Sequence, residues 1–289
     1  MTEFGTGSVR ANGIQFHYLE MGEGPLVLCL HGFPDHAYSY RYLLPELARA
    51  GFRAVAPFMR GYAPTEPATD GRYQPVLLAQ DALAIVAALG YERAALVGHD
   101  WGAGAVTGAA VLEPGKVSKL VTIASAHPGA GDRTNFHFLK GAWHAYYFQL
   151  PQAEQTVAHD DFAFIEEWWR DASPDWEIPM ELLESVKETF RKPGVLEAAL
   201  AYYRHSFNPA LQDPALGELE QRAKDPVTVP TLALHGTRDR PRRLEAFQDM
   251  DRFFTSELEK VIIPGAGHFI HQEKPTEVNA KIVEFLGRS

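Results

Sequence analysis

One tight turn of the chain carries the clearest candidate for chemistry. Asp100 stands between Gly98 and Gly102, each two residues away, after an expected strand and before an expected helix. This spacing corresponds to a nucleophile elbow, a turn so sharp that only small residues fit on either side of the nucleophile. The helix N-terminus beneath the turn would favour the ionised carboxylate. On this turn alone the alternative of an ordinary helix N-cap stays open.

A second turn could hold the negative charge that develops during such chemistry. The segment His31-Gly32-Phe33-Pro34 follows a short apolar run. In folds with a nucleophile elbow, an N–H from this loop and the N–H of the residue after the nucleophile form an oxyanion hole. The backbone N–H groups of Phe33 and Trp101 are therefore expected to form it.

Two further loops supply an acid and a base in the order nucleophile, acid, histidine that accompanies such an elbow. Asp239 comes a few residues after the apolar run 231–235, and His268 follows the apolar run 258–263. Each residue is commonplace alone. Together with Asp100, in this order and after expected strands, they predict a catalytic triad.

An aspartate nucleophile favours substitution at saturated carbon, as in an epoxide or an alkyl halide. Attack by the Asp100 carboxylate would give an alkyl ester, and water can then attack its carbonyl carbon. His268, oriented by Asp239, would activate that water. This chemistry requires no metal and no organic cofactor, and the twelve histidines show no metal-ligand spacing such as HExxH.

The elements that must position these residues alternate between strands and helices. Such alternation predicts an α/β fold with a mostly parallel sheet flanked by helices. Strands are expected over the apolar runs 14–19, 26–30, 52–56, 93–97, 117–124, 231–235 and 258–263. Helices are expected around 40–50, 76–89, 103–112, 244–254 and 277–286.

The alternation stops in the middle of the chain, where helical patterns continue without a convincing strand. We therefore predict a core formed by residues 1–130 and 222–289, interrupted by an all-helical cap over residues 131–221. This insertion is rich in aromatic residues: fifteen of the chain's 33 lie between Asp132 and Phe207. They are expected to roof an apolar pocket.

The chain resembles the epoxide hydrolases of the α/β-hydrolase fold, over nearly all of its length. The segments that carry the resemblance are HGFPD at 31–35, GHDWGAG at 98–104, HGTRD at 235–239 and GAGHFIHQEKP at 265–275. The resemblance implies hydrolysis of an epoxide to a vicinal diol through an ester on the nucleophile, beneath a helical cap.

The resemblance also implies two cap residues that donate protons to the epoxide oxygen. Tyr203 matches one family tyrosine, and His144 stands where the other is expected, although Tyr146 or Tyr147 could supply that hydroxyl instead. If His144 donates, an unperturbed imidazole would change charge near neutral pH. Residues that adjoin the motifs are expected to line the substrate pocket: Pro34, Trp143, Tyr147 and Phe269.

Two alternatives accompany this prediction. A haloalkane or haloacid dehalogenase would share the Asp100 nucleophile and the cap. Trp101 matches a halide-binding residue of haloalkane dehalogenases, but Phe33 stands where those enzymes usually carry asparagine, and no arginine directly follows the nucleophile. A non-catalytic binder of apolar ligands would have no need of all three triad residues.

Composition narrows the remaining classes. The net charge of −10 argues against a nucleic-acid partner, because phosphate recognition needs a basic surface. One cysteine, no apolar run long enough to span a membrane, and no signal-peptide pattern at the start favour a cytoplasmic protein. It is expected to be a monomer or homodimer that acts on a small apolar or aromatic epoxide.

The arginines that follow Asp239 are expected to form a solvated face: Arg240, Arg242 and Arg243.

Overall fold

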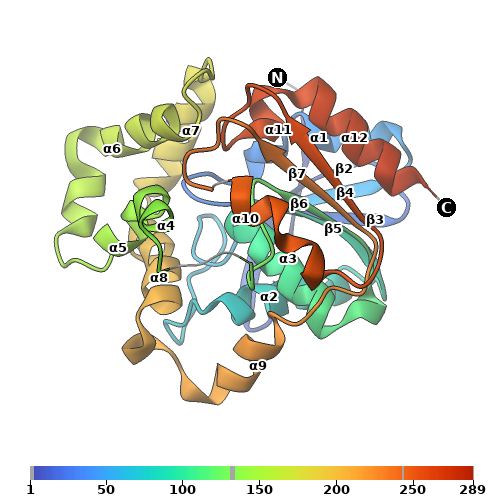
Figure 1. Ribbon diagram of the computed structural model, residues 1–289, viewed down its shortest axis with the longest axis horizontal. Coiled ribbons are helices and arrows are strands. Elements are labelled where there is room, and N and C mark those ends of the chain that lie inside the picture. Colours follow the sequence, from blue (N-terminus) through green and yellow to red (C-terminus); the bar gives the residue numbers. More distant parts are fainter. Residues whose placement is uncertain (1–2, 131–133, 243, 289) are drawn as a thin grey trace.

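The computed structural model describes residues 3–130, 134–242 and 244–288, and it is built on one eight-stranded sheet (Figure 1). The spatial order of the strands is β1-β2-β4-β3-β5-β6-β7-β8. β1 pairs antiparallel with β2, and β2 with β4, whereas β3 to β8 are all parallel. The strands are β1 (Gly5–Ala11), β2 (Ile14–Met21), β3 (Leu26–Leu30), β4 (Arg53–Pro57), β5 (Ala94–His99), β6 (Val117–Ile123), β7 (Thr231–Gly236) and β8 (Leu258–Ile263).

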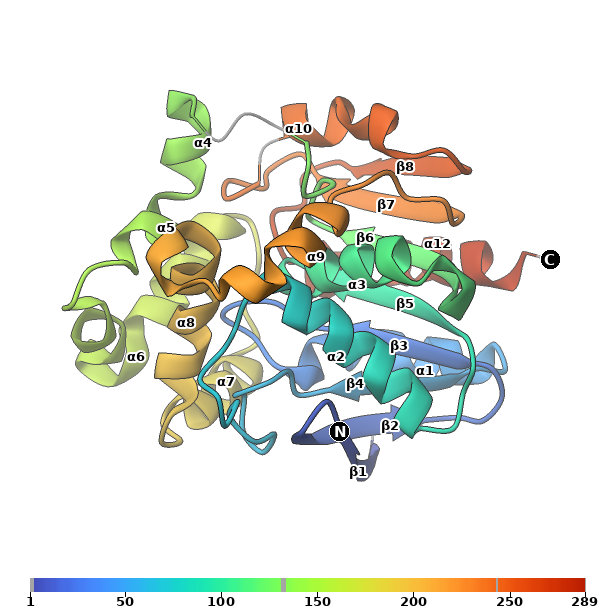
Figure 2. The ribbon, with the colours of Figure 1, turned by 90° about the horizontal axis from the view of Figure 1, so that it is seen from below.

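Helices cover both faces of this sheet. α2 (Pro75–Ala88) and α3 (Trp101–Leu112) lie on one face, and α1 (Leu43–Arg49) and α12 (Pro275–Gly287) on the other (Figures 1 and 2). Every residue of the central strands β3, β5 and β7 is buried as a result. Strands enclosed on both faces are near-continuous apolar runs, which is why the sequence identified them.

The α/β prediction is confirmed, and the differences are local. β1 was missed because its sequence, GTGSVRA, is polar and glycine-rich, as an edge strand can be. The expected helix at 244–254 is shorter: α10 (Leu244–Gln248) is followed by a 3-10 turn at Met250–Phe253.

Between β6 and β7, the described residues form helices and no strand. In Figure 2 most of these helices gather beside one end of the sheet, and the last of them lies beside α2 and α3. They are α4 (Phe136–Gly141), α5 (Trp143–Tyr147), α6 (Ala153–Ala172), α7 (Met180–Phe190), α8 (Val195–Phe207) and α9 (Gly217–Arg222). The predicted first residue of the cap, 131, lies outside the described residues, and the predicted end at 221 falls within α9.

A hydrogen bond beside a buried ion pair of the core joins this helical segment to the core. The Arg60 guanidinium donates to both carboxylate oxygens of Asp81 in α2, each at 2.6 Å. The Tyr202 hydroxyl of α8 donates to the Arg60 carbonyl at 2.9 Å. The position of α8 above the sheet is therefore fixed by hydrogen bonds as well as by apolar packing. No helix in the described part of the chain has the length and apolar character to cross a membrane.

Candidate active site

Asp100 sits at a strained turn between β5 and α3. Its φ of 50° and ψ of −111° lie outside the regions that most residues adopt. A Cβ at Gly98 would collide with the Gly102 carbonyl, and one at Gly102 would collide with the carbonyl of Leu30. Glycine is therefore required at both positions, as the elbow pattern predicts. The turn holds the Asp100 side chain almost fully buried above the sheet.

The loop after β3 contacts the first carboxylate oxygen of this side chain. The Phe33 N–H donates a hydrogen bond to Asp100 Oδ1 at 3.2 Å. Gly32 makes the approach possible, because a Cβ there would overlap the Asp100 Cβ. Trp101, whose N–H is the other expected donor, is the first residue of α3. Of the predicted pair, Phe33 is the donor whose hydrogen bond to Asp100 is described.

His268 and Asp239 lie beside the second oxygen. His268 Nδ1 is 3.0 Å from Asp239 Oδ2, and its Nε2 is 3.7 Å from Asp100 Oδ2. Nε2 is buried and has no hydrogen-bond partner among the described residues. If Nδ1 carries the proton that Asp239 accepts, the lone pair of Nε2 faces the nucleophile. The structure thus brings together the three residues that the sequence predicted as a triad.

The solvated face expected after Asp239 is wrong at Arg242. The Arg242 guanidinium donates to Asp100 Oδ2 at 3.0 Å, and the Arg242 backbone N–H donates to Asp239 Oδ1 at 2.8 Å. Arg240 does lie at the surface, paired with Asp171, and Arg243 lies outside the described residues. No local pattern distinguishes Arg242 from Arg240, because the inward position of Arg242 accompanies its backbone hydrogen bond to Asp239.

These charges set the ionisation of the site. Burial alone would raise the pKa of Asp100, but the positive charge of Arg242, with smaller effects of His268 and His99, lowers that pKa well below its ordinary value. Burial disfavours protonated His268, but the charge and hydrogen bond of Asp239, together with Asp100, raise the pKa of His268 above its ordinary value. Asp100 is therefore ionised at neutral pH without proton transfer to a base.

Two cap residues face this nucleophile. Tyr203 of α8 is buried, and its ring centroid lies 4.9 Å from that of Trp101 and 5.4 Å from that of His144. Both Tyr203 and His144 line the same cavity as Asp100. In contrast, the Tyr147 hydroxyl lies 2.6 Å from Thr156 Oγ1 and outside that cavity lining. Among the described residues, His144 is thus better placed than Tyr147 to reach a substrate above Asp100.

The expected titration of His144 near neutral pH is wrong. Burial, reinforced by the nearby charge of Arg242, lowers the pKa of His144 to about 3. Its Nδ1 is buried without a hydrogen-bond partner among the described residues. His144 is therefore a neutral imidazole throughout the neutral range, and it can donate one N–H but carries no charge.

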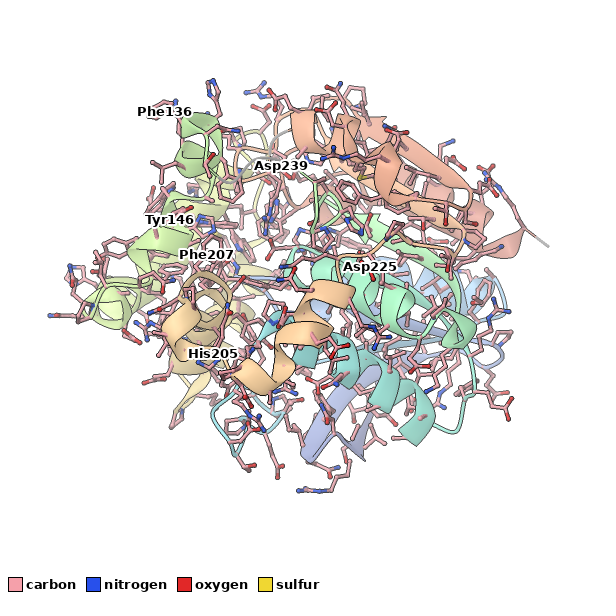
Figure 3. All side chains as sticks on the ribbon, turned by 60° about the horizontal axis from the view of Figure 1, so that its bottom comes forward. Phe136, Tyr146, His205, Phe207, Asp225 and Asp239 are labelled. Carbon is pink, nitrogen blue, oxygen red and sulfur yellow. The ribbon has the colours of Figure 1, made fainter. Side chains whose placement is uncertain are left out.

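A cavity of about 540 Å³ lies between the core and the helical segment. Asp100, Trp101 and Arg242 line it from the core, and His144, Trp168 and Tyr203 from the helices. In Figure 3, Asp239 is on the core side of this boundary, and Tyr146 and Phe207 are on the helical side. The volume falls within the range of small-molecule sites.

The four residues expected to line the pocket are not among those lining this cavity: Pro34, Trp143, Tyr147 and Phe269. Trp143 is 43% exposed on the outer side of its short helix. Pro34 and Phe269 lie behind the site, where both contact Trp169: its Nε1 donates to the Pro34 carbonyl, and its ring packs against Phe269. Adjacency to a catalytic motif in the sequence did not predict which residues line the cavity. In a short helix or turn, the side chains of adjacent residues point in different directions.

No group of three metal-ligating side chains occurs in the described ranges. The histidines near the site have partners of other kinds. His99 Nε2 is 3.0 Å from the His268 carbonyl oxygen, and the Met59 N–H donates to His31 Nε2. Burial lowers the pKa of both residues, to about 3 for His99 and about 4 for His31. They are buried, uncharged residues that hold the loops around Asp100 and His268.

Comparison with known proteins defines the class. A family profile described as the alpha/beta hydrolase fold matches residues 25–275. Epoxide hydrolase 3 of Xenopus tropicalis is 33% identical over 96% of this chain and 76% of its own length. Epoxide hydrolase 4 of Homo sapiens is 31% identical over 96% of this chain and 77% of its own length. An epoxide hydrolase of Bacillus megaterium, solved with an inhibitor, has a TM-score of 0.85 and 26% identity, covering 98% of this chain and 100% of that chain.

The chain therefore belongs to the epoxide hydrolases of the α/β-hydrolase fold. Membership favours this activity over the dehalogenase and binder alternatives. It agrees with a site built from a buried, ionised carboxylate beneath two uncharged donors.

Substitution of the elbow glycines tests the geometry of the turn. We expect Gly102→Ala to lower the midpoint of urea unfolding and to abolish activity, because its Cβ would collide with backbone. The matched control is Gly104→Ala in the same helix, where a Cβ meets nothing within 4 Å. That substitution should raise the free energy of unfolding by up to about 1 kcal/mol. Equal stability of the two variants would contradict this account of the turn.

Proposed function

We propose that the protein hydrolyses an epoxide to a vicinal diol through a covalent ester on Asp100. One observation carries the proposal. The buried Asp100 carboxylate, kept ionised by the positive charge of Arg242, accepts the Phe33 N–H on one oxygen and lies 3.7 Å from His268 Nε2 at the other. A carboxylate in this state needs no base to attack carbon, and the ester that it forms lies within reach of a histidine.

The first step opens the ring. Asp100 Oδ2 attacks one epoxide carbon, and the carbon–oxygen bond on that carbon breaks. The oxygen stays on the neighbouring carbon and takes a proton from Tyr203 or His144. Burial, with the charge of Asp100, raises the pKa of Tyr203 well above its ordinary value, so its hydroxyl is protonated before the reaction. Neutral His144 can support the same oxygen with an N–H.

The second step cleaves the ester. His268 Nε2 takes a proton from a water molecule, whose oxygen attacks the Asp100 carbonyl carbon. The resulting oxyanion forms on Oδ1, where the Phe33 N–H already donates, and the Trp101 N–H is proposed as the second donor. Asp239 stabilises the imidazolium of His268. Collapse of the intermediate breaks the ester bond, and the leaving alkoxide takes the proton from His268 Nε2 to give the diol. The remaining proton of the water, on the regenerated Asp100 carboxyl, returns to the cap donor, so that Asp100 is again ionised.

The cavity supports a substrate with an apolar or aromatic substituent. Trp101, Phe138 and Trp168 line it. A variant of the Bacillus megaterium enzyme, 26% identical to this chain, was solved with a naphthyloxy-propanediol product. For the present chain, a small aromatic epoxide is the proposed substrate. Cytoplasmic location and a monomeric or homodimeric state remain predictions from the sequence.

Replacement of the proposed base should separate the two steps. We expect His268→Gln to form the ester but to hydrolyse it at least about 10²-fold more slowly. Intact-protein mass spectrometry after exposure to styrene oxide should then show a stable adduct on the peptide that contains Asp100. Asp100→Asn is the control and should form none. An unmodified His268→Gln protein that still releases diol at the normal rate would contradict the assignment.

The first cap donor can be tested by comparing two aromatic substitutions. We expect His144→Phe to slow ring opening by about 10²-fold or more, because it removes the N–H and keeps a ring. Tyr147→Phe should have little effect, since its hydroxyl contacts Thr156 outside the cavity. Full activity of His144→Phe with loss in Tyr147→Phe would reverse the assignment.

The pH dependence of the same variants gives a second readout. Because His268 must be neutral to accept a proton, ester hydrolysis should gain rate as pH rises through its pKa. His144, with a pKa lowered to about 3, should add no limb in the neutral range. The pH–rate profile of His144→Phe should therefore have the same shape as that of the unsubstituted enzyme, with a lower rate at every pH.

A further inference from the structure

We propose that Arg242 recognises a carboxylate on the substrate, so that the preferred epoxides are 2,3-epoxy acids. The inference rests on the proposed function and adds the class of substrate. It starts from a cation that contacts the nucleophile: Arg242 donates to Asp100 Oδ2 at 3.0 Å.

Arg242 is held in place, and its guanidinium is accessible to a ligand. The Arg242 backbone N–H donates to Asp239 Oδ1, which fixes the loop between β7 and α10. The side chain lines the cavity and is 35% exposed there, while its partner Asp100 is only 5% exposed. A planar fork of donors that lines a cavity matches a carboxylate, with which arginine forms paired hydrogen bonds.

The chemistry of Asp100 removes the partner of Arg242. Once Oδ2 has formed the ester, Asp100 carries no charge, and the guanidinium loses the anion that its side chain contacts. The guanidinium, which is partly removed from water, then lacks a counter-ion in contact with its donors. In the covalent intermediate, a carboxylate of the substrate takes the place of the Asp100 carboxylate as the anion beside Arg242. The interaction between Arg242 and the substrate is therefore kept through ring opening.

The position of the guanidinium limits where the carboxylate must be. In a near-attack arrangement the epoxide carbon lies roughly 3–3.5 Å from Oδ2. Since the guanidinium also touches Oδ2, a carboxylate attached directly to the oxirane reaches it. Besides Asp100 and Arg242, the charged residues described in the cavity lining are Glu220, Lys224, Glu245 and Asp249. Arg242 and Lys224 are the two cations of this described lining, and Arg242 is the one that contacts Asp100.

A pair of matched substrates tests the inference. Styrene oxide is neutral, and 3-phenyloxirane-2-carboxylate carries the same ring with a carboxylate. For the unsubstituted enzyme we expect the larger kcat/KM with the acid. Arg242→Gln should lower the ratio of acid to neutral kcat/KM by about 10- to 100-fold, mainly through KM. Arg242→Lys should restore part of the ratio, because it keeps the charge without the fork.

Arg240→Gln is the matched control, since Arg240 lies two residues away on the surface, paired with Asp171. It should leave both rates unchanged. Binding of unreactive ligands provides a readout independent of turnover. By calorimetry, 3-phenylpropanoate should bind the unsubstituted enzyme more tightly than 3-phenylpropanamide, and Arg242→Gln should lose that difference.

The outcomes are distinguishable. Diol from styrene oxide without any preference for the acid, or a ratio unchanged in Arg242→Gln, would overturn the carboxylate inference and leave the proposed function standing. Diol from neither substrate would overturn both.

Discussion

The site depends on keeping one buried carboxylate ionised. A carboxylate removed from water normally takes up a proton, because burial disfavours its charged form. Asp100 avoids this through the guanidinium of Arg242 at 3.0 Å, the Phe33 N–H at 3.2 Å and His268 nearby. These groups come from three loops that follow different strands, so the nucleophile is active only when the sheet has assembled. The elbow glycines allow the loops to approach, which links the backbone strain at Asp100 to its charge.

The roof of the site shows the opposite electrostatic character. Tyr203 and His144 are buried in the helical segment and uncharged at neutral pH, because burial raises the pKa of the tyrosine and lowers that of the histidine. A charged nucleophile below and neutral proton donors above suit a reaction in which negative charge moves from Asp100 to the epoxide oxygen. The Tyr202 hydroxyl links α8 to the carbonyl of Arg60, whose guanidinium is paired with Asp81 in the core.

Most of this arrangement could be predicted from the sequence, for identifiable reasons. Parallel strands enclosed on both faces are apolar runs, and the residues at their carboxyl ends meet at one edge of the sheet. Hence Asp100, Asp239 and His268 were found from order and spacing. The helical segment could be recognised, and His144 and Tyr203 do line the cavity. Trp143 and Tyr147 do not, because the direction of their side chains depends on how short helices pack.

Arg242 shows where this reasoning ends. Nothing local separates it from Arg240, which pairs with Asp171 at the surface. The Arg242 backbone N–H donates to Asp239, and its side chain donates to Asp100. The neutral state of His144 was missed for a related reason, since it follows from burial and from that same guanidinium. Long-range electrostatics of this kind appear only when the chain is folded.

The central claim is that Asp100 forms an ester whose carbonyl carbon is attacked by water. A single turnover in ¹⁸O-labelled water, with enzyme in excess over styrene oxide, tests it directly. The account predicts that the label enters the Asp100 carboxylate, found by mass spectrometry of its peptide, and that the first diol released is unlabelled. Label in that diol, with none on the protein, would mean direct attack of water on the epoxide and would contradict the account.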